Sequence, residues 1–328
     1  MAGARARVFI DGDAGTTGLQ IRARLEPRDD IELLRIDPAR RKDADARAEL
    51  LNAADVVILC LPDDAAREAV SLITAPQVRV IDASTAHRTS GSWVYGLPEL
   101  SPVQRAAVAS ARRVSNPGCY PTGAVLLVRP LVDAGLVPAG HPITVNAVSG
   151  YSGGGRKMIE EFEGTEGAAP AGHPFRLYGL GLSHKHVPEI HRHAGLSHRP
   201  LFVPSVGRFA QGMLVSVPLA LWALPAQPSL GDLRRALTER YRGERFIEMA
   251  DAAETAALAS LAPEGLNGTN RVRLHVFGNE DDSHAVLVAL LDNLGKGASG
   301  AAVQSLNLML GRDEALGLED GTAAAVAA

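Results

Sequence analysis

The first third of the chain alternates short apolar runs with stretches of helical length, and this alternation restricts the possible folds more than any other feature. The clearest run is 56–61, Val-Val-Ile-Leu-Cys-Leu, which contains no charged residue. Strands buried on both faces of a parallel sheet have this composition. Further strands are predicted at 7–10, 31–36, 78–81 and 113–115. We therefore expect a parallel, doubly wound α/β sheet, with one of its helices starting at Ser101-Pro102.

Beyond residue 118 the apolar runs become longer, and fewer helices separate them. These runs lie at 143–148, 212–221, 272–276 and 285–290. Strands joined by short connections pair antiparallel, so we expect a mixed or antiparallel sheet in this half. The predicted domains are 1–118, completed by a C-terminal helix within 297–328, and an α+β domain at 119–296. The alanine-rich tail, 323–328, is expected to fray.

Charge and cysteine content argue against several classes of protein. Lys and Arg number 33 against 37 Asp and Glu, so the chain lacks the basic excess of a nucleic-acid binder. Its two cysteines are too few for a secreted disulfide framework. No apolar run approaches a membrane span, and the N-terminus lacks the apolar stretch of a signal peptide. We expect a cytoplasmic enzyme or ligand-binding protein, with neither nucleic acid nor membrane as a partner.

A glycine-rich turn joins the first predicted strand to the first predicted helix. Its glycines are Gly12, Gly15 and Gly18, and Thr16 and Thr17 precede the last of them. Such glycines let the backbone approach a pyrophosphate, whose charge a helix N-terminus favours. The spacing is G-x-x-G-x-x-G, not the commoner G-x-G-x-x-G. We expect a Rossmann-type dinucleotide site; a glycine-rich turn without a ligand is the alternative.

The end of the second predicted strand bears on which dinucleotide binds. Asp37 could accept a hydrogen bond from a ribose hydroxyl, as in NAD sites. Arg40, Arg41 and Lys42 follow immediately and could hold the 2′-phosphate of NADP, or could form a solvated loop. The residues alone leave this choice open.

Cys119 follows a Pro-Gly turn and begins an apolar segment, 119–128, that is predicted to be a helix. A thiol at a helix N-terminus is a better nucleophile near neutral pH. We expect Cys119 to be a nucleophile; an inert, small apolar side chain is the alternative. Cys60 lies within a predicted buried strand and is expected to be such a side chain.

Six of the ten histidines lie in one stretch of the chain. They are His173, His184, His186, His191, His193 and His198. Zinc requires three or four converging ligands, and Pro188 should interrupt any regular helix here, so we expect no metal. One or two of these histidines are better explained as a general acid or base, because a thiol nucleophile needs a proton partner.

A second glycine-rich segment, 149–157, follows a predicted strand and ends in Arg156 and Lys157. Successive backbone N–H groups beside two cations can form an anion-binding nest. A flexible loop with solvated charges is the alternative.

Four segments together resemble the short form of the N-acetyl-gamma-glutamyl-phosphate reductase family. They are 115–122 (SNPGCYPT), 149–157, 184–190 (HKHVPEI) and 292–302 (DNLGKGASGAA). The resemblance extends from about Val8 to Gly311, and the block around Cys119 is specific to this family. It implies a Rossmann-type doubly wound sheet plus a second α+β catalytic and oligomerisation domain, as in glyceraldehyde-3-phosphate dehydrogenase.

The family implies that NADPH reduces N-acetyl-L-glutamyl 5-phosphate to the 5-semialdehyde, with release of inorganic phosphate, in arginine biosynthesis. Cys119 would form a thioester, hydride would convert it to a thiohemiacetal, and a histidine would accept the hydroxyl proton. The family places this base in the His-x-His segment, so His184 and His186 are both candidates. Asp37 departs from what an NADP site would choose. A homodimer or homotetramer is expected.

The resemblance also implies further binding residues. For the cofactor they are Gly12, Gly15, Thr16, Thr17, Gly18, Arg40, Arg41, Pro62, Ser84, Asn293 and Gly297. For substrate and phosphate they are Arg88, Asn116, Ser149, Gly150, Ser152, Gly153, Arg156 and Glu189. Arg88 belongs to a stretch, 82–88, that resembles the family's Asp-x-Ser-x-x-x-Arg motif near the substrate.

Two other functions remain as alternatives. The first is a related acyl-phosphate reductase, such as aspartate-semialdehyde dehydrogenase or the aminoadipyl-phosphate enzyme of lysine biosynthesis. The second is a non-catalytic NADP-binding regulator. Cys119 at a predicted helix start and the paired histidines argue against the regulator.

Overall fold

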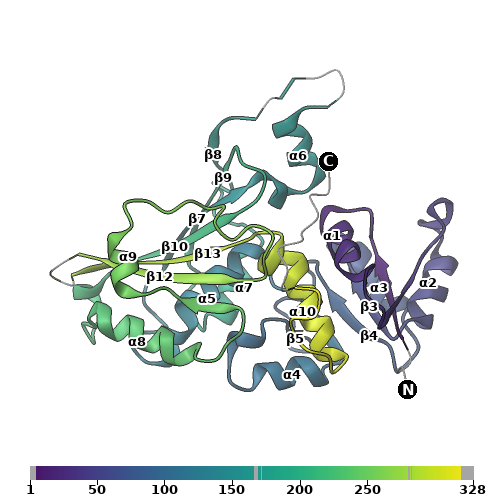
Figure 1. Cartoon of the computed structure of the whole chain (residues 1–328), viewed down its shortest axis with the longest axis horizontal. Helices are drawn as coiled ribbons and strands as arrows, with labels where there is room; N and C mark the ends of the chain where they lie inside the picture. Colours follow the sequence, from purple (N-terminus) through teal and green to yellow (C-terminus); the bar gives the residue numbers. More distant parts are fainter. Residues whose placement is uncertain (1–4, 166–168, 171, 280, 282, 319–328) are drawn as a thin grey trace. The chain divides into compact units, whose positions relative to one another are not determined.

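The computed structural model describes residues 5–165, 169–170, 172–279, 281 and 283–318. The chain divides into two compact units, each of which is shown in Figure 1. Unit 1 comprises the described residues up to Gly118 and from Ala298 onward, and unit 2 comprises Cys119–Gly297. The tail that was expected to fray lies outside the described residues.

Unit 1 contains a six-stranded parallel sheet with the order β2-β1-β3-β4-β6-β5. Its strands are β1 (Ala6–Asp11), β2 (Ile31–Leu34), β3 (Val56–Leu59), β4 (Arg79–Asp82), β5 (Val94–Tyr95) and β6 (Arg113–Ser115). Its α-helices are α1 (Thr16–Leu25), α2 (Ala44–Ala53), α3 (Asp63–Leu72), α4 (Gln104–Ser110) and α10 (Gly300–Met309). The predicted doubly wound parallel sheet is confirmed.

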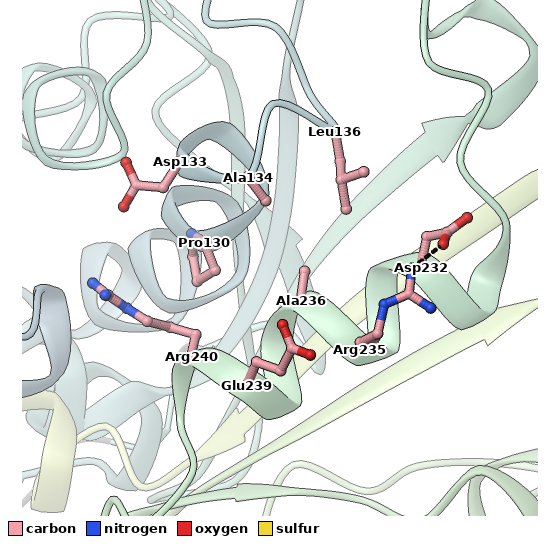
Figure 2. A pocket seen from close by; sticks show the side chains of 9 residues that line it. All are labelled: Pro130, Asp133, Ala134, Leu136, Asp232, Arg235, Ala236, Glu239 and Arg240. Atoms are coloured by element: carbon pink, nitrogen blue, oxygen red, sulfur yellow. Dashed lines mark hydrogen bonds and ion pairs between the residues drawn. The ribbon is translucent and has the colours of Figure 1, made fainter.

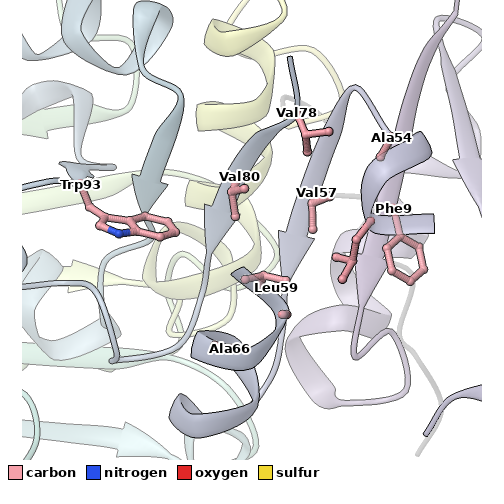
Figure 3. Close-up of a cluster of buried hydrophobic side chains, with 10 residues drawn as sticks. Phe9, Ala54, Val57, Leu59, Ala66, Val78, Val80 and Trp93 are labelled. Atoms are coloured by element: carbon pink, nitrogen blue, oxygen red, sulfur yellow. The ribbon is translucent and has the colours of Figure 1, made fainter. Parts of the chain in front are cut away.

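Alternate residues of the central strands form one hydrophobic core of unit 1. Side chains two residues apart in a strand share a face, and this core takes Val57 and Leu59 from β3 and Val80 from β4. Figure 3 shows these side chains together with Phe9 of β1 and Trp93. The core explains why 56–61 is almost wholly apolar, because β3 is buried along its whole length.

Unit 2 contains a seven-stranded mixed sheet with the order β11-β12-β13-β10-β7-β9-β8. Its strands are β7 (Thr144–Gly150), β8 (Phe175–Leu177), β9 (Leu201–Gly207), β10 (Met213–Ala220), β11 (Ile247–Met249), β12 (Val272–Gly278) and β13 (His284–Leu291). Its α-helices are α5 (Cys119–Asp133), α6 (Arg156–Glu163), α7 (Val187–His193), α8 (Leu230–Arg240) and α9 (Ala252–Ala257). The predicted mixed sheet is confirmed, and α5 packs against β10 and β13.

Three local predictions are wrong. Helix α4 starts at Gln104, not at Ser101, because the chain after Ser101 first makes a turn in which the Gln104 N–H donates to the Ser101 carbonyl at 2.9 Å. Pro188 does not interrupt a helix; it lies in the first turn of α7, where proline is tolerated. The helix expected from Gly297 is preceded by a π-helical turn, Gly295–Ser299.

Candidate functional site

The strand register of unit 1 places four strand ends in one row. The row consists of Asp11 (β1), Leu59 (β3), Asp82 (β4) and Ser115 (β6). The segments that leave these strands carry Gly12, Pro62, Ser84 and Asn116. Open α/β sheets bind ligands at the carboxyl ends of their strands. The structure therefore brings these predicted cofactor and substrate residues to one sheet edge.

The first glycine-rich turn fits a pyrophosphate. Gly12 has φ of +91°, and a β-carbon on it would lie 2.4 Å from a carbonyl oxygen that follows β3. A β-carbon on Gly18 would lie 2.4 Å from the Gly12 carbonyl oxygen. Gly15 instead has room beside it, and no side chain caps the helix that it precedes. An anion there would meet the first N–H groups of α1, from Thr16 and Thr17.

The residues that bear on NAD or NADP follow β2. Asp37 caps a 3-10 turn, and its carboxylate accepts a backbone N–H at 2.9 Å. Arg40 pairs with Asp43 at 3.0 Å, and Arg41 pairs at 3.6 Å with Asp13 of the glycine-rich turn. Both arginines are exposed enough for a phosphate to compete for them. The Asp37 carboxylate therefore already accepts a hydrogen bond from its own turn, whereas the Arg41 side chain lies beside the glycine-rich turn that fits the pyrophosphate.

The two cysteines have different surroundings. Loss of solvent around the sulfur, and then the carboxylates of Asp82 and Asp11, raise the pKa of Cys60 to about 12, although the residue as a whole is only partly buried. A thiol with this pKa is protonated at neutral pH and is a poor nucleophile. Cys119 is instead the first residue of α5, where the helix dipole favours a thiolate.

The π-helical turn packs closely against Cys119. A β-carbon on Gly297 would lie 2.8 Å from the β-carbon of Cys119. The Gly297 N–H donates to the carbonyl of Asp292, five residues earlier, at 3.0 Å, which is the π-helical bond. Such turns are frequent at functional sites. Glycine at 297 therefore lets the backbone approach the thiol-bearing residue.

The two candidate histidines pack around the residue next to Cys119. The ring centroids of His184 and His186 lie 4.8 Å apart, and 6.3 and 5.8 Å from the ring of Tyr120. The Tyr120 hydroxyl donates to the Ser205 carbonyl at 3.1 Å and accepts from the Tyr178 hydroxyl at 2.9 Å. This network fixes the first turn of α5 relative to the histidine pair.

The two histidines have different hydrogen bonds. The Nδ1 atom of His184 accepts the backbone N–H of His186 at 3.2 Å. Burial, and secondarily Lys185, lower the pKa of His184 to about 4, so its ring is neutral at pH 7. A neutral ring whose Nδ1 accepts carries its proton on Nε2, a tautomer assigned from this hydrogen bond. His184 is therefore a donor at Nε2, and His186, only 5% exposed, is the better candidate for accepting a proton.

The lowered pKa of His184 predicts a pH dependence of stability. The unfolded chain protonates this histidine near pH 6.5, whereas the folded protein does so only near pH 4. The unfolded state therefore binds more protons between these values, so the free energy of unfolding falls as the pH falls from about 6.5 to 4. Urea unfolding at several pH values should show a shallower dependence in His184→Gln than in the native protein. The exposed His198, changed to Gln, is the control; equal slopes in native and His184→Gln would contradict the prediction.

The second glycine-rich segment does not form the predicted run of free N–H groups. The N–H of Gly150 donates to the Gly212 carbonyl at 2.9 Å, and the N–H of Ser152 donates to the Ala210 carbonyl at 3.1 Å. The N–H groups of Gly150 and Ser152 are therefore already bonded within unit 2, and the anion nest expected over 149–157 stays a prediction for the rest of the segment. The cause is strand pairing, because the end of β7 continues along the turn that precedes β10.

Asn293 holds this segment in place from inside unit 2. Its Oδ1 accepts the N–H of Gly212 at 2.8 Å, and its Nδ2 donates to the Ser152 hydroxyl at 3.0 Å. A β-carbon on Gly153 would lie 3.1 Å from the Ser149 hydroxyl and 3.4 Å from Asn293 Nδ2. Three predicted substrate residues, Ser149, Ser152 and Gly153, thus gather around the buried amide of Asn293, which acts as an anchor for the segment.

The predicted charged substrate ligands differ in burial. Arg88 and Glu189 are 8% and 1% exposed. The side chain of Arg156 is 89% exposed and pairs with Glu160, one turn later in α6, at 2.7 Å. The Arg88 side chain is therefore buried within unit 1, whereas the Arg156 side chain lies along its own helix and is exposed to solvent.

Three further observations concern metal binding, membrane crossing and a separate pocket. In the described ranges, no group of three or more His, Cys, Asp and Glu side chains is arranged to hold a metal ion. None of the helices described here is both long and apolar enough to cross a membrane. A pocket of about 430 Å³ between α5 and α8, shown in Figure 2, is lined by charged residues such as Asp133, Arg235 and Glu239 and by none of the predicted site residues.

Tyr178 is a site residue that the sequence did not indicate. It follows the short edge strand β8 and is 58 residues from Tyr120, whose hydroxyl it contacts. Burial raises the pKa of Tyr178 to about 12, so it donates this hydrogen bond as a neutral phenol. No local pattern predicts a pairing over this distance; the two tyrosines meet because each bonds to β9, Tyr120 through its hydroxyl at Ser205 and Tyr178 through its N–H at Pro204.

Comparison with protein families places both units in known groups. Residues 7–108 match the semialdehyde dehydrogenase NAD binding domain, and residues 119–293 match the semialdehyde dehydrogenase dimerisation domain. Solved structures with the same fold include aspartate semialdehyde dehydrogenase II from Vibrio cholerae, at TM-score 0.69 and 16% identity, covering 94% of this chain and 99% of that one. The enzyme from Candida albicans, solved with NADP, has TM-score 0.62 and 14% identity, with coverages of 94% and 99%.

Curated relatives are far more similar in sequence. N-acetyl-gamma-glutamyl-phosphate reductase 2 of Nostoc sp. is 55% identical over 320 residues, covering 96% of this chain and 99% of the relative. The protein of the same name from Pseudomonas putida is 56% identical over 311 residues, covering 94% and 98%. N-acetyl-gamma-glutamyl-phosphate reductase of Burkholderia ambifaria is 56% identical over 304 residues, covering 93% and 96%.

Proposed function

The chain belongs to the N-acetyl-gamma-glutamyl-phosphate reductase family, and we infer that it reduces N-acetyl-L-glutamyl 5-phosphate to N-acetyl-L-glutamate 5-semialdehyde with NADPH, in arginine biosynthesis. The observation that carries this inference is Cys119 at the start of α5, next to a tyrosine that His184 and His186 enclose. The metabolite substrate and cofactor fit a cytoplasmic enzyme without nucleic acid or membrane as partners.

Cys119 is the nucleophile in the first half of the reaction. Its thiolate attacks the acyl carbon, a carbon–sulfur bond forms, and the bond from that carbon to the phosphate oxygen breaks. Inorganic phosphate leaves with the electron pair, and a thioester remains on Cys119. When bound, NADPH would supply a hydride to the thioester carbon, and with a proton that the carbonyl oxygen takes up from water the product is a thiohemiacetal.

The second half requires a base. His186 accepts the hydroxyl proton of the thiohemiacetal while the carbon–sulfur bond breaks, which releases the semialdehyde and returns the electron pair to Cys119. His184 orients His186, because its Nδ1 accepts the His186 backbone N–H. His184 is neutral and protonated on Nε2 in this arrangement, so it binds the substrate as a hydrogen-bond donor.

The reverse reaction tests this function. N-acetyl-glutamate 5-semialdehyde and phosphate, added with NADP⁺, should yield NADPH absorbance, and aspartate semialdehyde should yield far less. Comparable turnover of the two aldehydes would favour aspartate-semialdehyde dehydrogenase. Absence of turnover with both, together with measurable NADPH binding, would favour a regulator.

We expect the enzyme to prefer NADPH to NADH and to lose that preference when Arg40, Arg41 and Lys42 are all changed to Ser. The support is local: Asp37 is used as a turn cap, and Arg41 lies beside the glycine-rich turn. Arginine binds a phosphate through charge-assisted hydrogen bonds. The measurement is kcat/KM with each cofactor. Equal values for NADPH and NADH in the native enzyme would show that Asp37 selects NAD.

The family's dimerisation domain has an apolar sheet face that suits a second copy of the chain. A groove of about 490 Å³ on this face is lined by residues of β7, β8, β9, β10, β12 and β13, including Phe175, Leu177 and Val286. Phe175 is 56% exposed and Leu177 48% exposed. We propose assembly as a homodimer through this face; a homotetramer would need a further surface.

The dimer is tested by placing a charge in the groove. Val286→Glu should convert the dimer to monomer in sedimentation at micromolar concentration, because a carboxylate there would be desolvated. Trp222→Glu, at an exposed apolar residue outside the groove, is the control and should remain dimeric. A native-like assembly in Val286→Glu would place the interface elsewhere.

A further inference from the structure

A buried carboxylate organises the loop that follows β4. Asp82, the last residue of β4, is fully buried. Its carboxylate accepts the Ser84 N–H at 2.9 Å and the Ser84 hydroxyl at 2.8 Å, and it lies 2.6 Å from Nδ1 of His87. A buried carboxylate is strongly unfavourable unless several donors surround it. The loop is therefore folded around this one side chain.

The ring of His87 is fixed on its face as well as at Nδ1. It stacks on Trp93 with centroids 4.1 Å apart and planes 14° apart. The guanidinium of Arg113 lies 5.7 Å from the centroid of the same indole. The separation of 2.6 Å is short for a hydrogen bond between nitrogen and oxygen, so the ring is held closely against the carboxylate. His87 thus has two independent restraints and little freedom to turn.

The next residue in the chain is Arg88, the predicted ligand of phosphate or substrate carboxylate. It is 8% exposed, and its Nη2 donates to the Ala83 carbonyl at 2.9 Å, across the base of the loop. The backbone of Asp82 also accepts the N–H of Asn116, another predicted substrate residue, at 2.8 Å. Asp82 is therefore linked to both candidate ligands, to Asn116 through its backbone carbonyl and to Arg88 through the loop that its carboxylate holds.

We propose that His87 is a positioning residue: held by Asp82 and Trp93, it fixes the loop so that the Arg88 guanidinium is preorganised for an anionic group of the substrate. Preorganisation lowers the cost of ordering the guanidinium when the anion binds. The role rests on the proposed function, since the reductase reaction supplies the anions, phosphate and the substrate carboxylate. His87 transfers no proton in this scheme, because its Nδ1 is committed to Asp82.

Two substitutions at His87 separate its restraints. His87→Asn places an amide nitrogen near the position of Nδ1 and keeps the bond to Asp82. His87→Phe keeps the stacking on Trp93 and leaves the buried carboxylate without that donor. In the reverse assay, His87→Phe should raise the KM of the anion that Arg88 binds, the semialdehyde or phosphate, by about tenfold or more. The kcat and the fluorescence-measured affinity for NADPH should stay closer to the native values, and His87→Asn should recover most of the native KM.

The outcomes distinguish this inference from the proposed function. A native enzyme that does not turn over the semialdehyde overturns the function, and the inference with it. An active native enzyme with a native KM in His87→Phe overturns the inference alone. An equal loss of kcat in both variants would identify His87 as a proton-transfer group and also overturn it. If His87→Phe does not fold, Asp82→Asn tests the same link: a raised KM supports the role, and a native KM contradicts it.

Discussion

Cys119→Ser is expected to abolish the reductase activity while the variant still binds NADPH. The serine hydroxyl remains protonated at neutral pH, and its alkoxide is not favoured enough by a helix N-terminus to replace a thiolate. Cys119 alone carries the covalent step in the proposed mechanism, so we expect a loss on the order of 10⁴-fold or more in kcat. The measurements are the reverse assay and a fluorescence titration with NADPH.

Cys60→Ser is the matched control for this substitution. The Cys60 thiol has a pKa of about 12 because burial disfavours its thiolate, so it contributes no nucleophile near pH 7. We expect this variant to keep its activity and to lose stability at most, since a serine hydroxyl replaces a sulfur beside β3. Similar losses of activity in both variants, with both still folded, would contradict Cys119 as the nucleophile.

The reactivity of the two thiols with an alkylating reagent gives a second test of Cys119 as the nucleophile. Iodoacetamide should alkylate Cys119 first, because a thiolate reacts and a thiol does not. Loss of activity should follow the alkylation of this residue, as mass spectrometry of the peptides can show. Modification of Cys60 in parallel with the loss of activity would count against the different environments of the two sulfurs.

The sheets could be predicted because their signals are local. The apolar run at 56–61 predicts a doubly covered strand, and β3 is buried throughout. The start of α4 could not be predicted in the same way, because Ser101-Pro102 has the residues of a helix start but begins a turn that precedes the helix. Capping preferences do not distinguish such a turn from the first turn of a helix.

The features of the site could likewise be predicted only where their signals are local in the sequence. Glycine spacing predicts the first turn, because the steric needs of Gly12 and Gly18 arise within a few residues. Glycine spacing could not show that the N–H groups of 150–152 in the second glycine-rich segment bond to a turn about 60 residues later. The arrangement of His184 and His186 around Tyr120 likewise depends on contacts between separate elements. Residue types therefore predict the chemistry of the site, whereas the partner of each group depends on the tertiary fold.

His186→Asn is expected to lower kcat by roughly 10²–10⁴-fold, the usual effect of removing a general base. His184→Asn should act differently. The asparagine Oδ1 can still accept the N–H of His186, as His184 Nδ1 does at 3.2 Å, so the orientation of the base is kept. The lost donor at Nε2 should raise the KM of the substrate more than it lowers kcat. Steady-state kinetics of both variants in the reverse direction measure this difference.

The acid limb of the pH–rate profile separates the two histidines further. His184, with a pKa of about 4, stays neutral above pH 5, so its substitution should leave the shape of the profile between pH 7 and pH 5 unchanged. His186→Asn should change that shape, because it removes the proposed base. Zinc held by the pair would instead make a chelator inactivate the native enzyme and added zinc restore it, and we expect chelation to have no effect. Near-native kinetics in both variants would remove this segment from the mechanism, and a larger loss of kcat in His184→Asn would exchange the roles of the two rings.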